Sequence, residues 1–236
     1  MGKAPLKYRA VIFDLFGTLV KNSTVRQHED ILGRMASILS APPEDFIRLW
    51  YDTFYERCMG VLKTPEDNID YVCRKLGVAI EDKQRNLAAH TRFELTSHSM
   101  VPLPDSVKVL SQLKSEGYKT GLLTDCSAEV PAIFPETPLA PLFDVTVFSC
   151  LVGMKKPDPR IYHLATEQLK VKPRSCLYIG DGSSQELTGA AAAGMHPVLI
   201  RYPDEDSIEI HRVDAEADRW NGPTISSLTE VLALLN

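Results

Sequence analysis

The chain has 236 residues, of which 44% are hydrophobic, so it is long enough to bury a sizeable core in one large domain or two small ones. Its net charge is -5 and its lysines and arginines are scattered among acids, so we expect no binding to nucleic acid. The five cysteines are dispersed without zinc-ligand spacing, and no apolar segment approaches the length of a membrane span, so we expect a cytoplasmic protein that does not bind membranes.

The first predicted element is a buried strand that ends at an acid. Val11, Ile12 and Phe13 form a short apolar run, Asp14 follows it, and Gly17 indicates a turn. A carboxylate at the end of a buried strand costs free energy unless a positive charge or a donor meets it. On this stretch alone, a capping or turn aspartate is as good an interpretation as a catalytic acid.

Residues 21–101 carry the spacing of helices. Apolar residues recur at helical intervals, Pro43 and Pro65 stand where the first turn of a helix accepts proline, and Gly77 stands where a helix ends. We expect helices that span about 24–39, 43–59, 65–76 and 82–97.

From residue 102 onward, short apolar strands alternate with helices. We expect strands at 119–123, 145–148, 175–179 and 197–200, and helices at 107–116, 159–170, 186–193 and 224–235. Such alternation predicts a parallel sheet covered on both faces. The predicted fold class is therefore α/β: a doubly wound, Rossmann-like core of residues 1–20 and 102–236, interrupted by an all-helical insertion of residues 21–101.

Polar residues follow the predicted strands, and ligands bind such sheets beyond the carboxyl ends of the strands. Asp14, Thr124 and Asp181 end strands, Lys156 lies in a connection, and Glu186 begins a helix. Taken singly, each residue has a structural interpretation as a cap, a turn residue or a solvated loop side chain. Together they suit Mg²⁺ and a phosphoryl group, because the metal prefers hard oxygen ligands and phosphate oxygens need donors.

Four segments, in this order, resemble the motifs of the haloacid dehalogenase superfamily: Phe13-Asp14-Leu15-Phe16-Gly17-Thr18, Leu123-Thr124, Lys156-Pro157-Asp158-Pro159 and Gly180-Asp181. The resemblance extends from about residue 10 to residue 200. It implies a hydrolase with a Mg²⁺ cofactor, and it implies that the helical insertion is a cap domain over the active site.

The resemblance also implies roles for single residues. Asp14 would be the nucleophile, and Thr124 would donate a hydrogen bond to the transferring phosphate. Lys156 would offset the negative charges of Asp14 and the phosphate. The implied metal ligands are Asp14, the backbone carbonyl of Phe16, Asp181 and, in an assisting position, Glu186.

Three further residues are expected to contact the substrate, a small anionic molecule and most simply a phosphate ester. Gly17 lies within the first motif, and Asp125 stands where many relatives have an amide residue. Arg57 begins a segment between two helices of the insertion, where relatives have a specificity loop, and would hold an anionic group. A solvated arginine at a helix end is the alternative interpretation of Arg57. Trp50 and Phe54 are expected in the core of the insertion, and His28 is given no role.

Phe16 departs from the phosphatase pattern, which has a second aspartate at this position as general acid and base. One hypothesis is therefore a Mg²⁺-dependent phosphatase that lacks this proton donor. A second is a 2-haloacid dehalogenase or a phosphonatase-like hydrolase, the latter with Lys21 or Lys63 as a Schiff-base lysine. A third is a binding or regulatory module with weak or no turnover.

Overall fold

The computed structural model describes residues 7–203 and 216–235, so the outer parts of the predicted core at 1–6, 204–215 and 236 lie outside it. Six strands form one sheet in the order β3-β2-β1-β4-β5-β6, and every neighbouring pair is parallel. The strands are β1 (Ala10–Phe13), β2 (Lys119–Thr124), β3 (Val145–Phe148), β4 (Cys176–Gly180), β5 (His196–Ile200) and β6 (Thr224–Ile225). The predicted doubly wound parallel sheet is confirmed.

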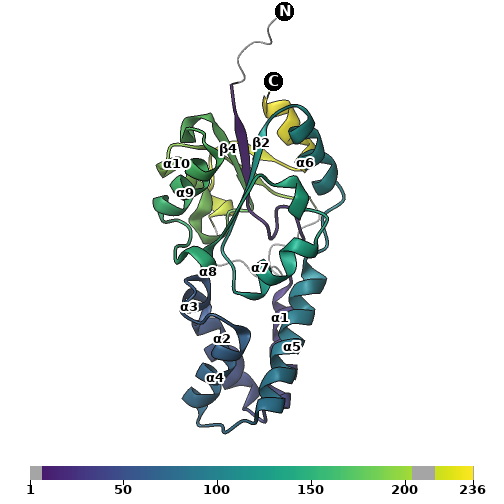
Figure 1. Cartoon of the computed structure of the whole chain (residues 1–236), viewed down its shortest axis with the longest axis vertical. Helices are drawn as coiled ribbons and strands as arrows, with labels where there is room; N and C mark the ends of the chain where they lie inside the picture. Colours follow the sequence, from purple (N-terminus) through teal and green to yellow (C-terminus); the bar gives the residue numbers. More distant parts are fainter. Residues whose placement is uncertain (1–6, 204–215, 236) are drawn as a thin grey trace, which may run out of the picture.

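Helices cover both faces of the sheet, as Figure 1 shows, with α9 (Pro159–Leu169) and α10 (Glu186–Ala192) on one side and α6 (Ser106–Ser115) on the other. Side chains of a strand alternate between the two faces, so β1 contributes to both cores. Val11 and Phe13 pack with α6, whereas Ala10 and Ile12 pack with α9 and α10. Short helices complete the sheet half: α7 (Glu129–Ile133), α8 (Ser149–Val152), η1 (Phe134–Glu136), η2 (Ala140–Leu142), η3 (Pro173–Ser175), η4 (Ser183–Gln185), η5 (Ala217–Arg219) and η6 (Leu228–Leu235).

The segment between β1 and α6 forms a helical block with a hydrophobic core of its own. This core includes Leu32, Met35, Phe46, Trp50 and Ile69. The block consists of α1 (Val25–Ile38), α2 (Pro43–Asp52), α3 (Phe54–Cys58), α4 (Pro65–Leu76) and α5 (Asp82–Ser99). It lies beyond the carboxyl ends of the strands (Figure 1). A division into domains at residues 20/21 and 101/102 stays a prediction.

The two chain segments that join the helical block to the sheet run side by side. Val20 pairs with Pro102 in an isolated bridge, and the backbone N–H of Leu103 donates to the Leu19 carbonyl at 2.9 Å. The Ser106 hydroxyl donates to the same carbonyl at 2.7 Å. The chain therefore leaves the sheet half and returns to it at one place.

The structure corrects two predicted helices. The predicted helix at 224–235 begins instead with β6, because Thr224 and Ile225 pair with β5, and a 3-10 helix, η6, follows. The predicted helix at 43–59 is broken into α2 and α3 at Thr53, whose hydroxyl donates to the Trp50 carbonyl at 2.8 Å and whose ψ is 8°.

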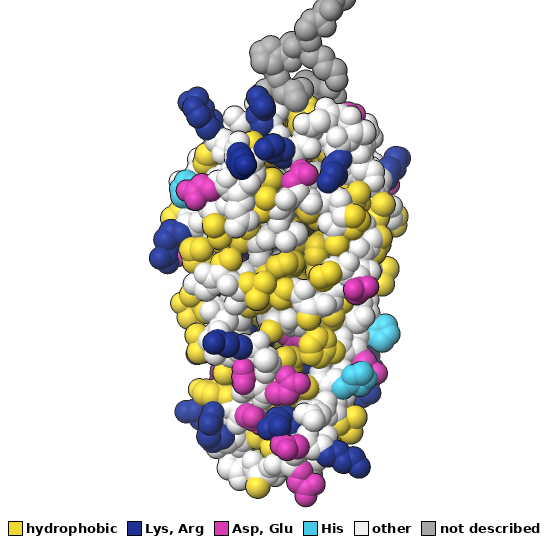
Figure 2. Space-filling model, viewed as in Figure 1, with side chains coloured by type: hydrophobic (Ala, Val, Ile, Leu, Met, Phe, Trp, Pro, Cys, Tyr) yellow, Lys and Arg dark blue, Asp and Glu magenta, His cyan; other side chains and the backbone are white. Residues whose placement is uncertain are grey.

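The surface shows no segregation of charge on the face drawn in Figure 2. Positive and negative side chains are interspersed toward both ends of that face, and hydrophobic atoms form a belt between them. None of the described helices combines the length and the apolar composition that a bilayer span requires.

Gly60 and Gly77 give a matched test of how closely the helical block and the sheet half are packed. Both glycines have φ of +67°. A Cβ added at Gly60 would collide with the Cys150 carbonyl oxygen, whereas a Cβ added at Gly77 would have no atom within 4 Å among the described residues. Gly77→Ala should cost about 1–2 kcal/mol for the left-handed backbone alone. Gly60→Ala should cost clearly more in urea unfolding. Equal costs would contradict the close contact at Cys150.

Candidate active site

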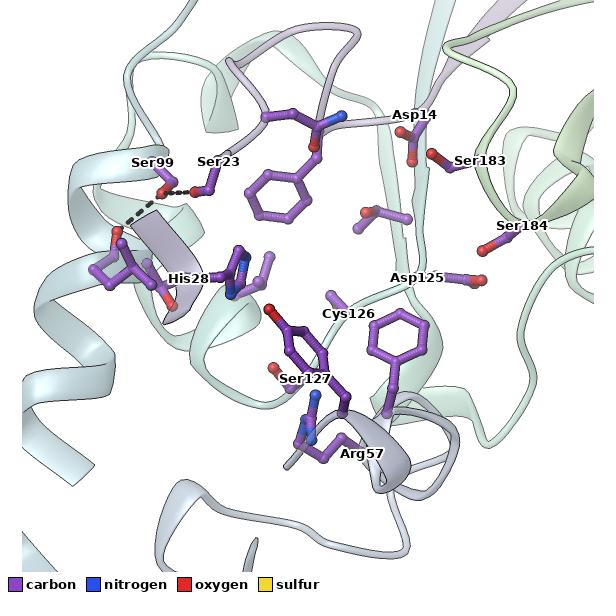
Figure 3. A pocket seen from close by; sticks show the side chains of 18 of the residues that line it. Asp14, Ser23, His28, Arg57, Ser99, Asp125, Cys126, Ser127, Ser183 and Ser184 are labelled. Atoms are coloured by element: carbon purple, nitrogen blue, oxygen red, sulfur yellow. Dashed lines mark hydrogen bonds between the residues drawn. The ribbon is translucent and has the colours of Figure 1, made fainter. Parts of the chain in front are cut away.

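A cavity of ≈ 150 Å³ lies between the carboxyl ends of the strands and the helical block. Figure 3 shows Asp14 and Ser183 on one side of it and His28 and Arg57 on the other. Six of the predicted site residues line it: Asp14, Phe16, Arg57, Thr124, Asp125 and Lys156. Gly17 lies behind this lining with φ of +73°, where a Cβ would collide with the Asp181 carboxylate. Only a glycine leaves room for that carboxylate.

Lys156 is the centre of a buried ionic cluster. Its Nζ donates to Asp14 Oδ1 at 2.7 Å and to Glu186 Oε2 at 2.5 Å, and each of these side chains is at most 6% exposed. The Tyr178 hydroxyl donates to the same Glu186 oxygen at 2.7 Å. One ammonium therefore connects the end of β1 to the start of α10.

The charges in this cluster are not balanced. Burial raises the pKa of Asp14 to about 6; the Lys156 charge opposes that shift and the Asp181 charge adds to it. Burial likewise raises the pKa of Glu186 to about 8, against the effect of Lys156. Burial alone would lower the pKa of Lys156, but Asp14 and Glu186 raise it well above its usual range, so the lysine stays charged.

Asp14, Asp181 and Glu186 each place a carboxylate oxygen within 4.8 Å of the others. Three acids around one lysine leave an excess of negative charge, and hard oxygen donors suit Mg²⁺. Glu186 already accepts hydrogen bonds at both oxygens, because Gly182 N donates to Oε1 at 2.9 Å and Lys156 and Tyr178 donate to Oε2. The donor set therefore fits a divalent cation held mainly by Asp14 and Asp181.

Thr124 and Asp125 differ in what they offer to a ligand. The Thr124 hydroxyl is buried and has no hydrogen-bond partner among the described residues, so it is available to a bound oxygen. Asp125 Oδ1 accepts from the backbone N–H of Lys156 at 3.0 Å, and Oδ2 lies 3.5 Å from Lys155 Nζ. Asp125 thus positions the segment that carries Lys156, and its predicted contact with substrate stays a prediction.

The helical block contributes residues that the sequence did not identify. His28, Tyr51 and Arg92 line the cavity, as do Trp50 and Phe54, which were expected only in the core of the insertion. Trp50 does both, because it also belongs to that core. One pattern in the sequence could have pointed to Arg92. It lies four residues from both Ala88 and Thr96, so it shares a helix face with small side chains that leave room beside it.

Arg57 lies at the cavity, but it is not a solvated arginine. It is 6% exposed, and its Nη1 donates to the Trp50 carbonyl at 2.5 Å and to the Thr53 hydroxyl at 2.6 Å. Burial, together with the nearby Arg92 charge, lowers the pKa of Arg57 to about 10. One terminal nitrogen of Arg57 is therefore occupied by hydrogen bonds at the junction of α2 and α3.

Comparisons with known proteins find relatives that match most of the chain. The haloacid dehalogenase-like hydrolase family matches residues 8–194. A glyceraldehyde 3-phosphate phosphatase of Pyrococcus furiosus is 27% identical over 97% of this chain and 93% of its own. The (S)-2-haloacid dehalogenase 1 of a Pseudomonas species is 26% identical over 81% of this chain and 84% of its own. The solved 2-haloacid dehalogenase of Pseudomonas syringae shares the fold, with a TM-score of 0.67 and 23% identity over 97% and 98% of the chains.

Replacement of Lys156 tests the charge imbalance. Lys156→Met should destabilise the metal-free protein by roughly 3–5 kcal/mol at pH 8, because the buried carboxylates of Asp14 and Glu186 lose the cation that pairs with both. A carboxyl with a raised pKa binds its proton more tightly in the folded state, so the loss should shrink as the pH falls from 8 to 5. Urea unfolding at pH 8 and pH 5 measures this loss, with Lys83→Met, the replacement of an exposed lysine, as control. A loss that is independent of pH would contradict this account.

Proposed function

Because this chain belongs to the family of haloacid dehalogenase-like hydrolases, we propose that it hydrolyses phosphate monoesters of small metabolites with the help of Mg²⁺. The observation that carries the proposal is the cluster of Asp14, Asp181 and Glu186 around the single ammonium of Lys156. A cluster with this excess of negative charge calls for a further cation. Relatives that are named phosphatases support the same activity.

In the proposed reaction, an Asp14 oxygen attacks phosphorus, the bond from phosphorus to the ester oxygen breaks, and an aspartyl phosphate remains. The departing oxygen takes a proton from water and leaves as an alcohol. Water then attacks this phosphorus, which releases inorganic phosphate and restores the Asp14 carboxylate. Lys156 holds the attacking carboxylate and offsets charge, and the unpaired Thr124 hydroxyl donates to a phosphate oxygen. When bound to Asp14, Asp181 and the Phe16 carbonyl, Mg²⁺ supplies further neutralisation of the phosphate.

The helical block, residues 21–101, serves in this proposal as a cap that closes over the reacting groups. Its side chains line the cavity together with those of the sheet half, which supports that role. Exclusion of water by such a closure strengthens every charge interaction at Asp14. The reaction needs no membrane, and we propose a cytoplasmic location.

Dehalogenation is the second candidate, and Phe16 is the residue that favours it. A dehalogenase expels halide, which needs no proton from a general acid, and a relative of this chain carries that name. The phosphonatase-like alternative lacks comparable support, because Lys21 and Lys63 are exposed and Lys156 is the one lysine among the described residues that line the cavity.

Phosphate release decides between the candidates. The protein should hydrolyse p-nitrophenyl phosphate only with Mg²⁺, and Asp14→Asn should abolish the reaction, because an amide oxygen is a poor nucleophile. Halide release from 2-chloropropionate without added metal is the competing outcome, and chelator distinguishes the two. Undiminished phosphatase activity in excess chelator would exclude the metal-dependent reaction. An inactive protein that still retains a phosphate analogue would indicate a binding module.

Phe16→Asp should increase kcat/KM for an alkyl phosphate such as glycerol 3-phosphate by at least about 10-fold, because a positioned proton donor contributes roughly 10²–10⁴-fold. The gain should be smaller for p-nitrophenyl phosphate, whose leaving group departs without a proton. Phe16→Asn, of nearly the same shape but without a proton to give, serves as the control. Equal gains from both variants would attribute the effect to space or polarity rather than to proton transfer.

A further inference from the structure

Two guanidinium groups meet at the helical-block end of the cavity. The Cζ atoms of Arg57 and Arg92 lie 5.0 and 5.9 Å from the centroid of the Trp50 ring. Both residues are less than 10% exposed, and both line the cavity. Two positive charges that share one aromatic ring repel each other, so this arrangement requires negative charge nearby.

Glu129 supplies only part of that negative charge. Its Oε1 accepts from Arg92 Nε at 3.0 Å across the boundary between α5 and α7, and its side chain is 2% exposed. Burial alone would raise the pKa of Glu129, but Arg92 and other donors hold it below its usual value, so it stays ionised. No carboxylate of the helical block lines the cavity among the described residues. Glu56, which precedes Arg57 in the chain, also acts on the Arg57 charge, but it lies outside the cavity lining. Among the described residues, the arginine pair therefore has no helical-block carboxylate beside it in the cavity.

Arg92 also has a donor to spare. Its Nη1 atom is buried and has no hydrogen-bond partner among the described residues. The side chain is held in place by the hydrogen bond from its Nε to Glu129. A charged donor that is buried without an acceptor is costly, and such groups mark places where a ligand completes the hydrogen bonding.

We propose that this end of the cavity binds a carboxylate of the substrate, with Arg92 Nη1 as its principal donor and Arg57 as a second positive charge. The proposal rests on the proposed phosphatase function, because it places the phosphoryl group of the same molecule at Asp14. A planar carboxylate accepts hydrogen bonds from a guanidinium group in one plane, and its single negative charge adds less repulsion from the nearby acids than the nearly two charges of a second phosphate. A cavity of ≈ 150 Å³ suits a chain of only a few carbons between the two groups. The substrate class is therefore a short phosphorylated carboxylic acid.

Two phosphonates test this proposal without any turnover. 3-Phosphonopropionate carries a carboxylate, and propylphosphonate has a methyl group in its place. In calorimetric titrations with Mg²⁺ present, wild-type protein should bind the carboxylate probe about 10- to 100-fold more tightly, the usual effect of hydrogen bonds to a charged group. Arg92→Met should reduce this ratio to near one.

Glu129→Gln separates a binding role of Arg92 from a purely structural one. A structural role predicts that both variants weaken the binding of both probes. Binding by charge predicts opposite signs, because loss of the Glu129 charge leaves Arg92 more positive and should raise the ratio. Arg85→Met, the same replacement on the same helix but outside the cavity lining, should leave the ratio unchanged.

The double variant Arg92→Met/Glu129→Gln is the control for a folding defect, because it removes both charges of the buried pair. It should also bind the two probes with an affinity ratio near one. Equal affinities for the two probes in wild type, binding of neither probe, or an unchanged ratio in Arg92→Met would each overturn the proposal. Phosphate release is assayed separately, so a protein that discriminates between the probes but hydrolyses no ester refutes the phosphatase function alone.

Discussion

The contact on which the rest of the molecule depends is that of the Lys156 ammonium with the carboxylates of Asp14 and Glu186. It joins the end of β1, the segment before α9 and the start of α10, which are distant in sequence. Burial raises the pKa of both acids even beside that cation, and its loss would raise them further. The same lysine falls short of the total acidic charge, so the contact that holds the strand ends together also leaves the excess of negative charge on which the proposed metal site rests.

The sequence alone was sufficient for five of the six strands and for the residues at their carboxyl ends. Each of these five strands is a short, mainly apolar run, and β3 lies at the predicted residues, 145–148. Because parallel strands bring their carboxyl ends to one edge, Asp14, Thr124 and Asp181 could be placed together before any contact was known. Local sequence patterns are sufficient to predict the position of a side chain where the direction of the strand determines that position.

Contacts between distant segments could not be predicted in this way. β6 depends on pairing with β5, and both Thr53 and Arg57 donate to the Trp50 carbonyl where α2 ends. The pairing of Arg92 with Glu129 joins two halves of the molecule that the sequence treats as separate. An arginine at helical spacing looks the same in the sequence whether solvent or a carboxylate faces it.

The adjacent entry and exit of the helical block, fastened at Leu19, have a consequence for how such a protein can diversify. A segment whose two ends meet is a module: it can be exchanged, lengthened or replaced without any change in strand order. Asp14 and Lys156 belong to the sheet half, whereas Arg57 and Arg92 arrive with the module. In the proposed function, reaction chemistry and substrate choice would thus be encoded in separable stretches of the gene, so that the second could evolve while the first stays constant.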